Sequence, residues 1–265
     1  MTDLDQSEIS GVEYRIDQSV ATITLNAPER KNALSPELVT ALADRLDDAM
    51  ADDGVRVVVL TNRGTTFCAG ADLKSSSPGA GDGTGRSRTF VEVFEAIQRG
   101  TKPVIGRIDG HATGGGVGLV AVCDISVMRD DAKIGFTEVR IGVAPAIISV
   151  VCLPKLSRAD ATELFLTGER IAPVRAAEVG LINRAVPASE LDETVNHFVD
   201  QLMLGGPNAL AFAKRLIHEV PDMPVAEAFA WTAVHSAALF GEEEAKQGIA
   251  AFRNREPAPW VVSRS

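Results

Sequence analysis

The sequence predicts a mixed α/β protein whose C-terminal part is entirely helical. In the first half of the chain, short β-branched segments alternate with segments of helical periodicity, whereas beyond about residue 158 only helical patterns follow one another. Of the 265 residues, 45% are hydrophobic and 23% are charged, which is typical of globular proteins and not of disordered ones. This length is enough for one large domain with an appendage.

The first half supplies the strands. Residues 20–25 (VATITL) and 55–60 (VRVVVL) are short, apolar and β-branched, as buried strands are. Between them, Ser35 offers an N-cap and Pro36 a first helical position, and a stripe of apolar residues at helical spacing follows, ending near residue 54. The same reasoning predicts further elements in this order: a loop at 75–88, a helix at 89–99, a strand at 103–108, a glycine-rich segment at 110–118, a helix to about 123 and a strand at 125–128.

The C-terminal part supplies only helices. Glycines and prolines divide it into predicted helices at 158–167, 173–179, 188–204, 207–219 and 224–254. The last of these carries apolar residues that could cover the core of its own chain or contact another copy. An α/β core with a helical tail is the architecture that these patterns predict.

Charge and cysteine content exclude several classes of protein. The net charge of −10 argues against a protein that binds nucleic acid or an anionic membrane surface. Cys68, Cys123 and Cys152 lie far apart and form no CxxC pair, so neither a disulfide framework nor a metal site is expected. The N-terminal residues lack the pattern of a signal peptide, and no apolar run reaches the roughly 18 residues of a membrane span. We therefore expect a cytoplasmic protein that is not inserted in a membrane.

Two segments of small residues can expose backbone N–H groups. Residues 67–74 (FCAGADLK) follow a predicted strand, where a tight turn is the alternative to a ligand-binding role. Residues 109–119 (DGHATGGGVGL) place three glycines at the start of a helix, where unshielded N–H groups attract a phosphate or a developing oxyanion. Gly116, Gly118 and Ala121 also match the loose dinucleotide pattern GxGxxA, but they lie several residues past the strand end.

A third segment, residues 132–143 (AKIGFTEVRIGV), places Glu138 between apolar and β-branched residues. Taken alone, this glutamate could simply be solvated or paired with Arg140. In order along the chain, the three segments resemble the enoyl-CoA hydratase/isomerase (crotonase) family. The resemblance starts at residues 20–34, with the NAL element, and continues through LTGERI and AAEVGLINRAV to AFRNREPAPW near the C-terminus.

The resemblance implies a fold, a division of the chain and an assembly. The fold is a crotonase-like spiral of ββα units with a C-terminal helical trimerisation segment. Residues 1–200 would form the spiral core for acyl-CoA binding and catalysis, and residues 201–265 the helical oligomerisation segment. The expected partners are an acyl-CoA thioester and further copies of the chain, as a homotrimer or a dimer of trimers. No cofactor is implied, because coenzyme A is part of the substrate.

The resemblance also assigns site residues. The backbone N–H groups of Ala71 and Gly115 match the family's oxyanion hole, which stabilises negative charge on the thioester oxygen. The residues matched to the coenzyme A channel run through the first segment and include two basic positions near the phosphates: Ala69, Gly70, Asp72, Leu73, Lys74, Arg30 and Lys31. A space-filling role is expected for Cys68, a turn-fixing role for Asp72 and a loop-packing role for His111.

Family hydratases use two glutamates to hold and activate a water. Glu138 matches one of them, whereas the other position is occupied by Gly118. A single carboxylate can move a proton between carbon atoms, as in the family's isomerases, or act as the sole acid and base in hydration. Three functions therefore stay open, in this order: an enoyl-CoA hydratase, an enoyl-CoA isomerase and a non-catalytic acyl-CoA-binding protein. The segments GGGVGLV and TEVRIGVAPAIIS resemble bacterial hydratases of branched or carboxylated substrates such as 3-methylglutaconyl-CoA.

Overall fold

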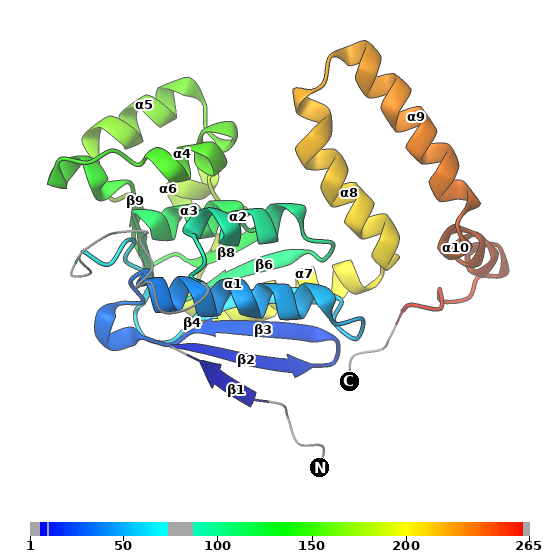
Figure 1. The fold of residues 1–265 in the computed structure, drawn as a ribbon, viewed down its shortest axis with the longest axis horizontal. Helices are drawn as coiled ribbons and strands as arrows, with labels where there is room; N and C mark the ends of the chain where they lie inside the picture. The colour runs from blue at the N-terminus through cyan, green and yellow to red at the C-terminus, as the bar shows by residue number, and fades with distance from the viewer. Residues whose placement is uncertain (1–5, 10, 74–86, 262–265) are drawn as a thin grey trace.

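A computed structural model describes residues 6–9, 11–73 and 87–261 of the chain. Lys74 and most of the loop predicted at 75–88 lie outside these ranges. Seven strands form a mixed sheet in the order β1-β2-β3-β4-β6-β8-β10, and three form a small parallel sheet in the order β5-β7-β9 (Figure 1). The strands are β1 (Gln6–Ile9), β2 (Val12–Asp17), β3 (Val20–Leu25), β4 (Val57–Asn62), β5 (Thr66–Cys68), β6 (Val104–Ile108), β7 (His111–Thr113), β8 (Ile125–Arg129), β9 (Ile134–Gly135) and β10 (Arg184–Val186).

Helices cover both faces of the large sheet. The α-helices are α1 (Pro36–Ala51), α2 (Phe90–Arg99), α3 (Gly115–Val122), α4 (Ala146–Cys152), α5 (Arg158–Thr167), α6 (Pro173–Glu178), α7 (Leu191–Met203), α8 (Pro207–Glu219), α9 (Val225–Gly241) and α10 (Glu243–Asn254). The first three pack on one face, where the main hydrophobic core lies, and α7 packs on the other with its own cluster around Val57 and Ile105. Because the inner strands are buried on both faces, they are apolar almost throughout.

The spiral repeats one step three times. β4 of the large sheet leads into β5 of the small sheet, β6 leads into β7, and β8 leads into β9. The pairs β3–β4, β4–β6 and β6–β8 are parallel, and so are β5–β7 and β7–β9. Since parallel strands end at the same edge of a sheet, the segments that follow β5, β7 and β9 are brought together.

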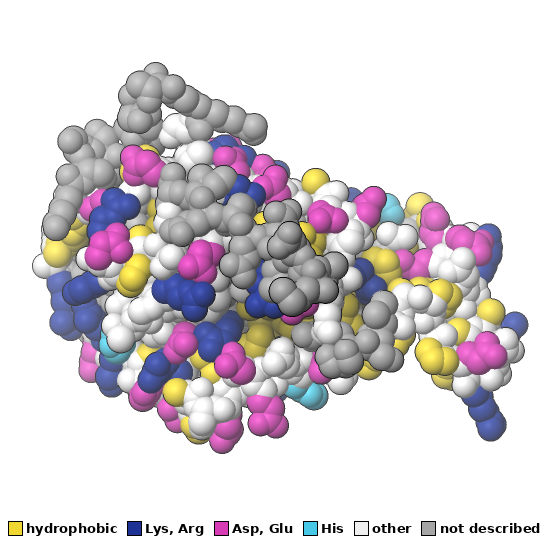
Figure 2. Space-filling model, turned by 90° about the horizontal axis from the view of Figure 1, so that it is seen from below, with side chains coloured by type: hydrophobic (Ala, Val, Ile, Leu, Met, Phe, Trp, Pro, Cys, Tyr) yellow, Lys and Arg dark blue, Asp and Glu magenta, His cyan; other side chains and the backbone are white. Residues whose placement is uncertain are grey.

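Helices α8, α9 and α10 form an arm that projects from the spiral (Figure 1). The arm is joined to the spiral by Lys214 of α8, whose Nζ donates to Asp124 Oδ2 at 2.7 Å and to the Lys102 carbonyl at 3.0 Å. None of the residues of α9 is buried, and the side chains of Phe229 and Phe240 are 73% and 68% exposed. Figure 2 shows hydrophobic side chains among the charged ones along the arm.

Most predicted elements are confirmed, and α5, α8 and β3 have the predicted bounds. The strand predicted at 55–60 begins and ends two residues later, as β4, and the helix predicted at 224–254 is two helices divided at Glu242. The sequence patterns missed β5, β7 and β9, which have three, three and two residues, because so short a strand shows no periodicity. The predicted division at residue 200 falls inside α7, and the arm begins at Pro207.

The side chain of Asn32 connects the segment before α1 to the turn between β4 and β5 by hydrogen bonds. Its side chain is fully buried, its Oδ1 accepts from the Ala27 N–H at 2.7 Å, and its Nδ2 donates to the carbonyls of Arg63 and Thr66 at 3.1 and 2.7 Å. With φ of +51°, it also occupies the left-handed region, which asparagine tolerates better than most residues.

Asn32→Ala is expected to lower the free energy of unfolding by about 3 kcal/mol. The variant removes three hydrogen bonds to backbone groups, one of them from the N–H of the buried Ala27, and each such loss costs about 1 kcal/mol. Urea unfolding followed by circular dichroism measures the change, with Asn208→Ala on the arm as a surface control. A loss below about 1 kcal/mol would contradict this role for the amide.

Candidate functional site

The first segment of the site follows β5. Gly70 lies in the left-handed region with φ of +88°, and a Cβ at this position would lie 3.0 Å from the Gly115 nitrogen and from the Thr113 carbonyl oxygen. A side chain would therefore push the two segments apart. Leu34 bonds to the residues on either side of Ala71, donating to the Gly70 carbonyl and accepting from the Asp72 N–H. In such a parallel bridge, the N–H of the middle residue, Ala71, points away from the Leu34 strand.

The second segment follows β7. Gly114 has φ of +57° and ψ of −129°, and it turns the chain so that Gly115 becomes the first residue of α3. The first N–H groups of a helix have no acceptor within the helix, and they lie at its positive end. Within the described residues, neither the Ala71 N–H nor the Gly115 N–H has a backbone acceptor. The structure thus brings together the two segments that carry these predicted donors, since the Cβ position of Gly70 lies 3.0 Å from the Gly115 nitrogen.

The third segment follows β9. A short 3-10 helix, η2 (Thr137–Ile141), carries Glu138, and its carboxylate lies against the other two segments. A Cβ on Gly114 would be 3.5 Å from Glu138 Oε1, and it would be 3.6 Å from the Gly70 Cα. The carboxylate therefore lies beside the point where the first two segments meet.

The environment of Glu138 favours proton transfer. Its Oε2 is buried and, in the part of the chain that the structure describes, has no hydrogen-bond partner. Burial raises the pKa of the carboxyl above its ordinary value, opposed in part by a hydrogen bond from its own backbone N–H. A carboxyl with a raised pKa and a free oxygen can take a proton from one atom of a ligand and return it to another.

Gly118 lies where family hydratases carry a second glutamate, and no space for such a side chain exists in this structure. A Cβ on Gly118 would be 2.5 Å from Ile148 Cγ2 and 2.7 Å from Phe94 Cζ, which is closer than carbon atoms approach. Ile148 and Phe94 are themselves 3% and 4% exposed. Hydrocarbon therefore fills the position, and Glu138 is the one glutamate that the described part of these three segments carries.

Gly118→Glu is expected to destabilise the protein by about 3 kcal/mol and not to raise its activity. The new side chain would overpack the contact with Ile148 and Phe94 and bury a carboxylate among apolar groups. Thermal unfolding and a hydration assay test both parts, and Ile148→Ala in the same chain should recover part of the stability by making room. Enhanced hydration by a stable Gly118→Glu variant would contradict the packing argument.

The residues predicted to line the coenzyme A channel lie around the first segment. Ala71 and Leu73 are exposed and Asp72 is half-buried, whereas the Ala69 carbonyl accepts from the Thr113 hydroxyl at 3.2 Å. Arg30 and Lys31 are exposed on the loop that precedes Asn32, and the Lys31 carbonyl accepts from the Ala69 N–H at 3.1 Å. This bond places the two predicted basic residues beside the β5 segment.

The other candidate groups take structural positions. Cys68 is fully buried, and burial raises the pKa of its thiol to about 12, so it is not a nucleophile. His111 Nδ1 accepts from the Lys133 N–H at 2.9 Å, which ties β7 to the turn before β9. The described residues contain no group of three or more His, Cys, Asp or Glu side chains that could hold a metal ion.

Apolar residues around the donors were not singled out from the sequence. A Cβ on Gly115 would lie 2.7 Å from Leu34 Cδ1 and 3.5 Å from Phe90 Cε1, and the rings of Phe90 and Phe94 are 4.4 Å apart. Leu34 precedes α1 and Phe90 opens α2, so chain segments distant in sequence form one apolar wall. In the sequence, only the NAL element (residues 32–34) indicated one of these apolar residues, Leu34.

Comparison with known proteins finds relatives over nearly the whole chain. A family model described as enoyl-CoA hydratase/isomerase matches residues 15–262. A Thermus thermophilus protein provisionally named as an enoyl-CoA hydratase is 36% identical over 242 residues, which cover 90% of this chain and 96% of that protein. The carnitinyl-CoA dehydratase of Salmonella typhi is 30% identical, over 91% of this chain and 94% of the relative. The (E)-benzylidenesuccinyl-CoA hydratase of Thauera aromatica is 29% identical, over 92% and 96%.

Solved structures share the fold. An enoyl-CoA hydratase of Mycobacterium smegmatis superimposes with a TM-score of 0.85 at 30% sequence identity, over 99% of this chain and all of that one. The AtuE protein of Pseudomonas aeruginosa superimposes with a TM-score of 0.87 at 27% identity, over 96% of this chain.

Proposed function

Because the chain belongs to the enoyl-CoA hydratase/isomerase family and has the crotonase fold, we propose that it adds water to the double bond of a 2-enoyl-CoA thioester. One observation carries the proposal. The half-buried side chain of Glu138, whose Oε2 is buried and unpartnered among the described residues, lies beside the meeting point of the Gly70–Ala71 and Gly114–Gly115 segments. This arrangement supports a base and two oxyanion donors that act on one ligand.

In the proposed reaction, negative charge develops on the thioester oxygen and Glu138 transfers a proton. The thioester oxygen accepts hydrogen bonds from the Ala71 and Gly115 N–H groups. Water bonds to the β-carbon through its oxygen, Glu138 takes the water proton, and the electron pair of the double bond moves toward the thioester oxygen as an enolate. The protonated Glu138 then gives its proton to the α-carbon and returns to its ionised form. Loss of one oxyanion donor in such a site typically costs about 3 kcal/mol of transition-state stabilisation.

The packing at Gly118 favours a second candidate, an enoyl-CoA isomerase. Since one carboxylate is present, it could move a proton between the α- and γ-carbons without adding water. A non-catalytic acyl-CoA-binding protein is the third candidate, and the Glu138 carboxyl argues against it, because a purely binding pocket has no need of an acid with a buried, unpartnered oxygen and a raised pKa.

The proposed substrate is a branched or carboxylated enoyl-CoA. The resemblance of GGGVGLV and TEVRIGVAPAIIS to hydratases of such substrates supports it, with 3-methylglutaconyl-CoA as the compound to test. The acyl carboxylate of such a substrate could hold the attacking water in place of the missing glutamate. The wall formed by Leu34, Phe90 and Phe94 would contact the apolar part of the acyl group.

The remaining features of the proposal concern binding, assembly and location. Coenzyme A enters as part of the substrate, with Arg30 and Lys31 near its phosphates, and no separate cofactor takes part. The exposed apolar side chains of α9 and α10, such as Phe229 and Phe252, would be covered in a homotrimer or a dimer of trimers. No helix in the described ranges is both long and apolar enough to cross a membrane. A cytoplasmic location is proposed on the sequence features alone.

A chromatographic assay with three thioesters separates the candidates. Purified enzyme is incubated with crotonyl-CoA, 3-hexenoyl-CoA and 3-methylglutaconyl-CoA. We expect a hydroxyacyl product, most rapidly from 3-methylglutaconyl-CoA. Efficient hydration of crotonyl-CoA with none of 3-methylglutaconyl-CoA would overturn the substrate class. A shifted double bond without hydration would make the protein an isomerase, and tight binding without any product would make it a binding protein.

A further inference from the structure

The geometry points to Asp109 as a positioning residue that, with Arg107 and Arg129, fixes the oxyanion hole from the opposite end of the small sheet. The inference rests on the proposed function, because it assumes that the N–H groups of Ala71 and Gly115 bind the thioester oxygen. Asp109 itself does not contact the site. It lies six residues before Gly115, in the turn between β6 and β7.

Three such turns, here called the joints, connect the large sheet to the small one. They comprise residues 63–65 between β4 and β5, residues 109–110 between β6 and β7, and residues 130–133 between β8 and β9. Each joint is followed by a strand of only two or three residues, and each of these strands ends at a segment of the site. The separation between the donors and Glu138 therefore depends on how the joints are held.

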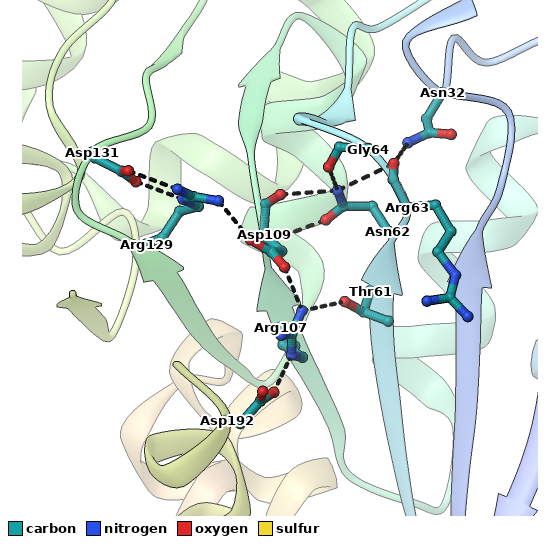
Figure 3. A network of polar contacts seen from close by, with 10 residues as sticks. All are labelled: Asn32, Thr61, Asn62, Arg63, Gly64, Arg107, Asp109, Arg129, Asp131 and Asp192. Atoms are coloured by element: carbon teal, nitrogen blue, oxygen red, sulfur yellow. Dashed lines mark hydrogen bonds and ion pairs between the residues drawn. The ribbon is translucent and has the colours of Figure 1, made fainter. Parts of the chain in front are cut away.

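The Asp109 carboxylate accepts hydrogen bonds from two arginines that lie on neighbouring strands of the large sheet (Figure 3). Its Oδ2 accepts from Arg107 at 3.0 Å, and its Oδ1 accepts from Arg129, the last residue of β8, at 3.0 Å. Arg129 also donates two bonds to Asp131, and Arg107 donates to Asp192 of α7 at 2.6 Å. The Asp109 carboxylate thus links the joint after β6 to the end of β8.

The backbone of Asp109 links the same joint to the one after β4. The Asp109 N–H donates to Asn62 Oδ1 at 3.0 Å, and its carbonyl accepts from Asn62 Nδ2 at 3.0 Å, so the amide replaces a partner strand (Figure 3). At the next residue, a Cβ on Gly110 would lie 2.4 Å from the Thr65 carbonyl oxygen. The joint after β6 therefore packs directly against the joint after β4. Asp109 is therefore bound at once to the last residues of both neighbouring strands, β4 and β8.

The short strands transmit this constraint. A strand rises about 3.3 Å per residue, so the three residues of β7, which lie between Asp109 and Gly114, span about 10 Å. A small tilt at the joint would displace the Gly115 N–H relative to that of Ala71 by a few tenths of an ångström or more. Enzymes are sensitive to such displacements, and a misplacement of 1 Å can lower a rate by about 100-fold. Side chains that support a reacting group typically contribute factors of about 10 to 100.

The test is Asp109→Asn, with Asp131→Asn as the matched control. Both substitutions remove a carboxylate from Arg129, but only the first releases the link between the joints. The side chain of Asp131 is 56% exposed, so its ion pair contributes little. Asp109→Asn is expected to lower kcat for the preferred enoyl-CoA about tenfold with KM changed less than twofold, whereas Asp131→Asn stays within twofold in both.

A spectroscopic signature separates positioning from a loss of stability. Butyryl-CoA labelled with ¹³C at its carbonyl is saturated and is not hydrated, and hydrogen bonds from an oxyanion hole lower its carbonyl stretching frequency. Difference infrared spectra should show a large shift on binding to the wild-type protein, a smaller one with Asp109→Asn and an unchanged one with Asp131→Asn. If Asp109→Asn does not fold, Arg129→Gln releases the same link and should show the same smaller shift.

Each outcome decides one question. A full carbonyl shift in both Asp109→Asn and Arg129→Gln, whatever their melting temperatures, overturns the positioning role and leaves the proposed function intact. An unshifted carbonyl in the wild-type protein shows instead that the proposed oxyanion hole is wrong.

Discussion

Glu138→Gln is expected to lower kcat by about 10³-fold while binding of the CoA thioester changes little. Glutamine keeps the size of the side chain but cannot take or give the proton, and general acid–base catalysis contributes typically about 10² to 10⁴-fold. Because Ile148 and Phe94 fill the space beside Gly118, the variant carries a glutamate at neither of the two positions matched to the family's pair. Hydration kinetics with the preferred enoyl-CoA and calorimetric binding of butyryl-CoA measure the two effects.

Glu193→Gln, which alters an exposed glutamate on α7, is the control and should behave like the wild-type enzyme. A Glu138→Gln variant that retains more than a tenth of the wild-type kcat would show that another group carries the proton.

The pH dependence of activity is expected to reflect the ionisation of the Glu138 carboxyl. Burial raises the pKa of Glu138, and the carboxyl must be ionised to accept the water proton. The value of kcat/KM is therefore expected to fall as pH falls through this pKa, with an acid limb above about 4.3, the ordinary value for glutamate. A limb at or below that value would mean that the carboxylate is solvated in the free enzyme.

Stability should change in the opposite direction from activity in Glu138→Gln. A raised pKa means that the folded protein holds the proton more tightly than the unfolded chain, so ionising Glu138 at neutral pH destabilises the fold. The variant is expected to be more stable than the wild type at pH 7, as is common where function requires an unfavourable group. The difference should shrink as pH falls through the folded pKa and vanish below about 4.3, where both states of the wild type are protonated.

Gly70→Ala is the second change with a large expected effect, a loss of about 10²-fold or more in kcat/KM. Its Cβ would lie 3.0 Å from the Gly115 nitrogen and would both separate the two donors and cover one of them. Removal of one oxyanion donor typically costs about 10² to 10³ in kcat. The infrared shift of bound ¹³C-butyryl-CoA should decrease together with the activity.

Gly142→Ala separates the cost of the backbone conformation from that of the lost donor. Gly142 has φ of +81°, close to the +88° of Gly70, but a Cβ there meets nothing within 4 Å. Both variants should lose about 1 kcal/mol of stability or more from the positive φ. Equal losses of carbonyl shift in the two variants would contradict a specific role for the contact between Gly70 and Gly115.

Much of the site could be predicted because its donors are backbone groups in glycine-rich segments. The segments around Ala71 and Gly115 are recognisable in the sequence because only small residues allow such a close approach, and the order of three segments identified the family. In the structure, Gly70 and Gly114 both adopt positive φ, a region that glycine occupies at little cost. The residue roles themselves stay predictions until the variants are measured.

Other features depend on contacts between distant segments. The absence of a glutamate at position 118 is visible in the sequence, but its consequence is not, because Phe94 and Ile148 come from helices 24 residues before it and 30 after it. The same holds for Asp109, whose partners Asn62 and Arg129 stand on two other strands.

The sequence by itself determined the α/β class, most helices other than α4, the inner strands and the family, because these follow from periodicity, end signals and glycine-rich segments that are local in the chain. Only the tertiary structure decided that three strands of two or three residues form a second sheet, that hydrocarbon fills the space beside Gly118, and that Asp109 joins three strands. The physical reason is that burial, close approach and the pKa of Glu138 are properties of a site assembled from several segments, and no one segment contains them.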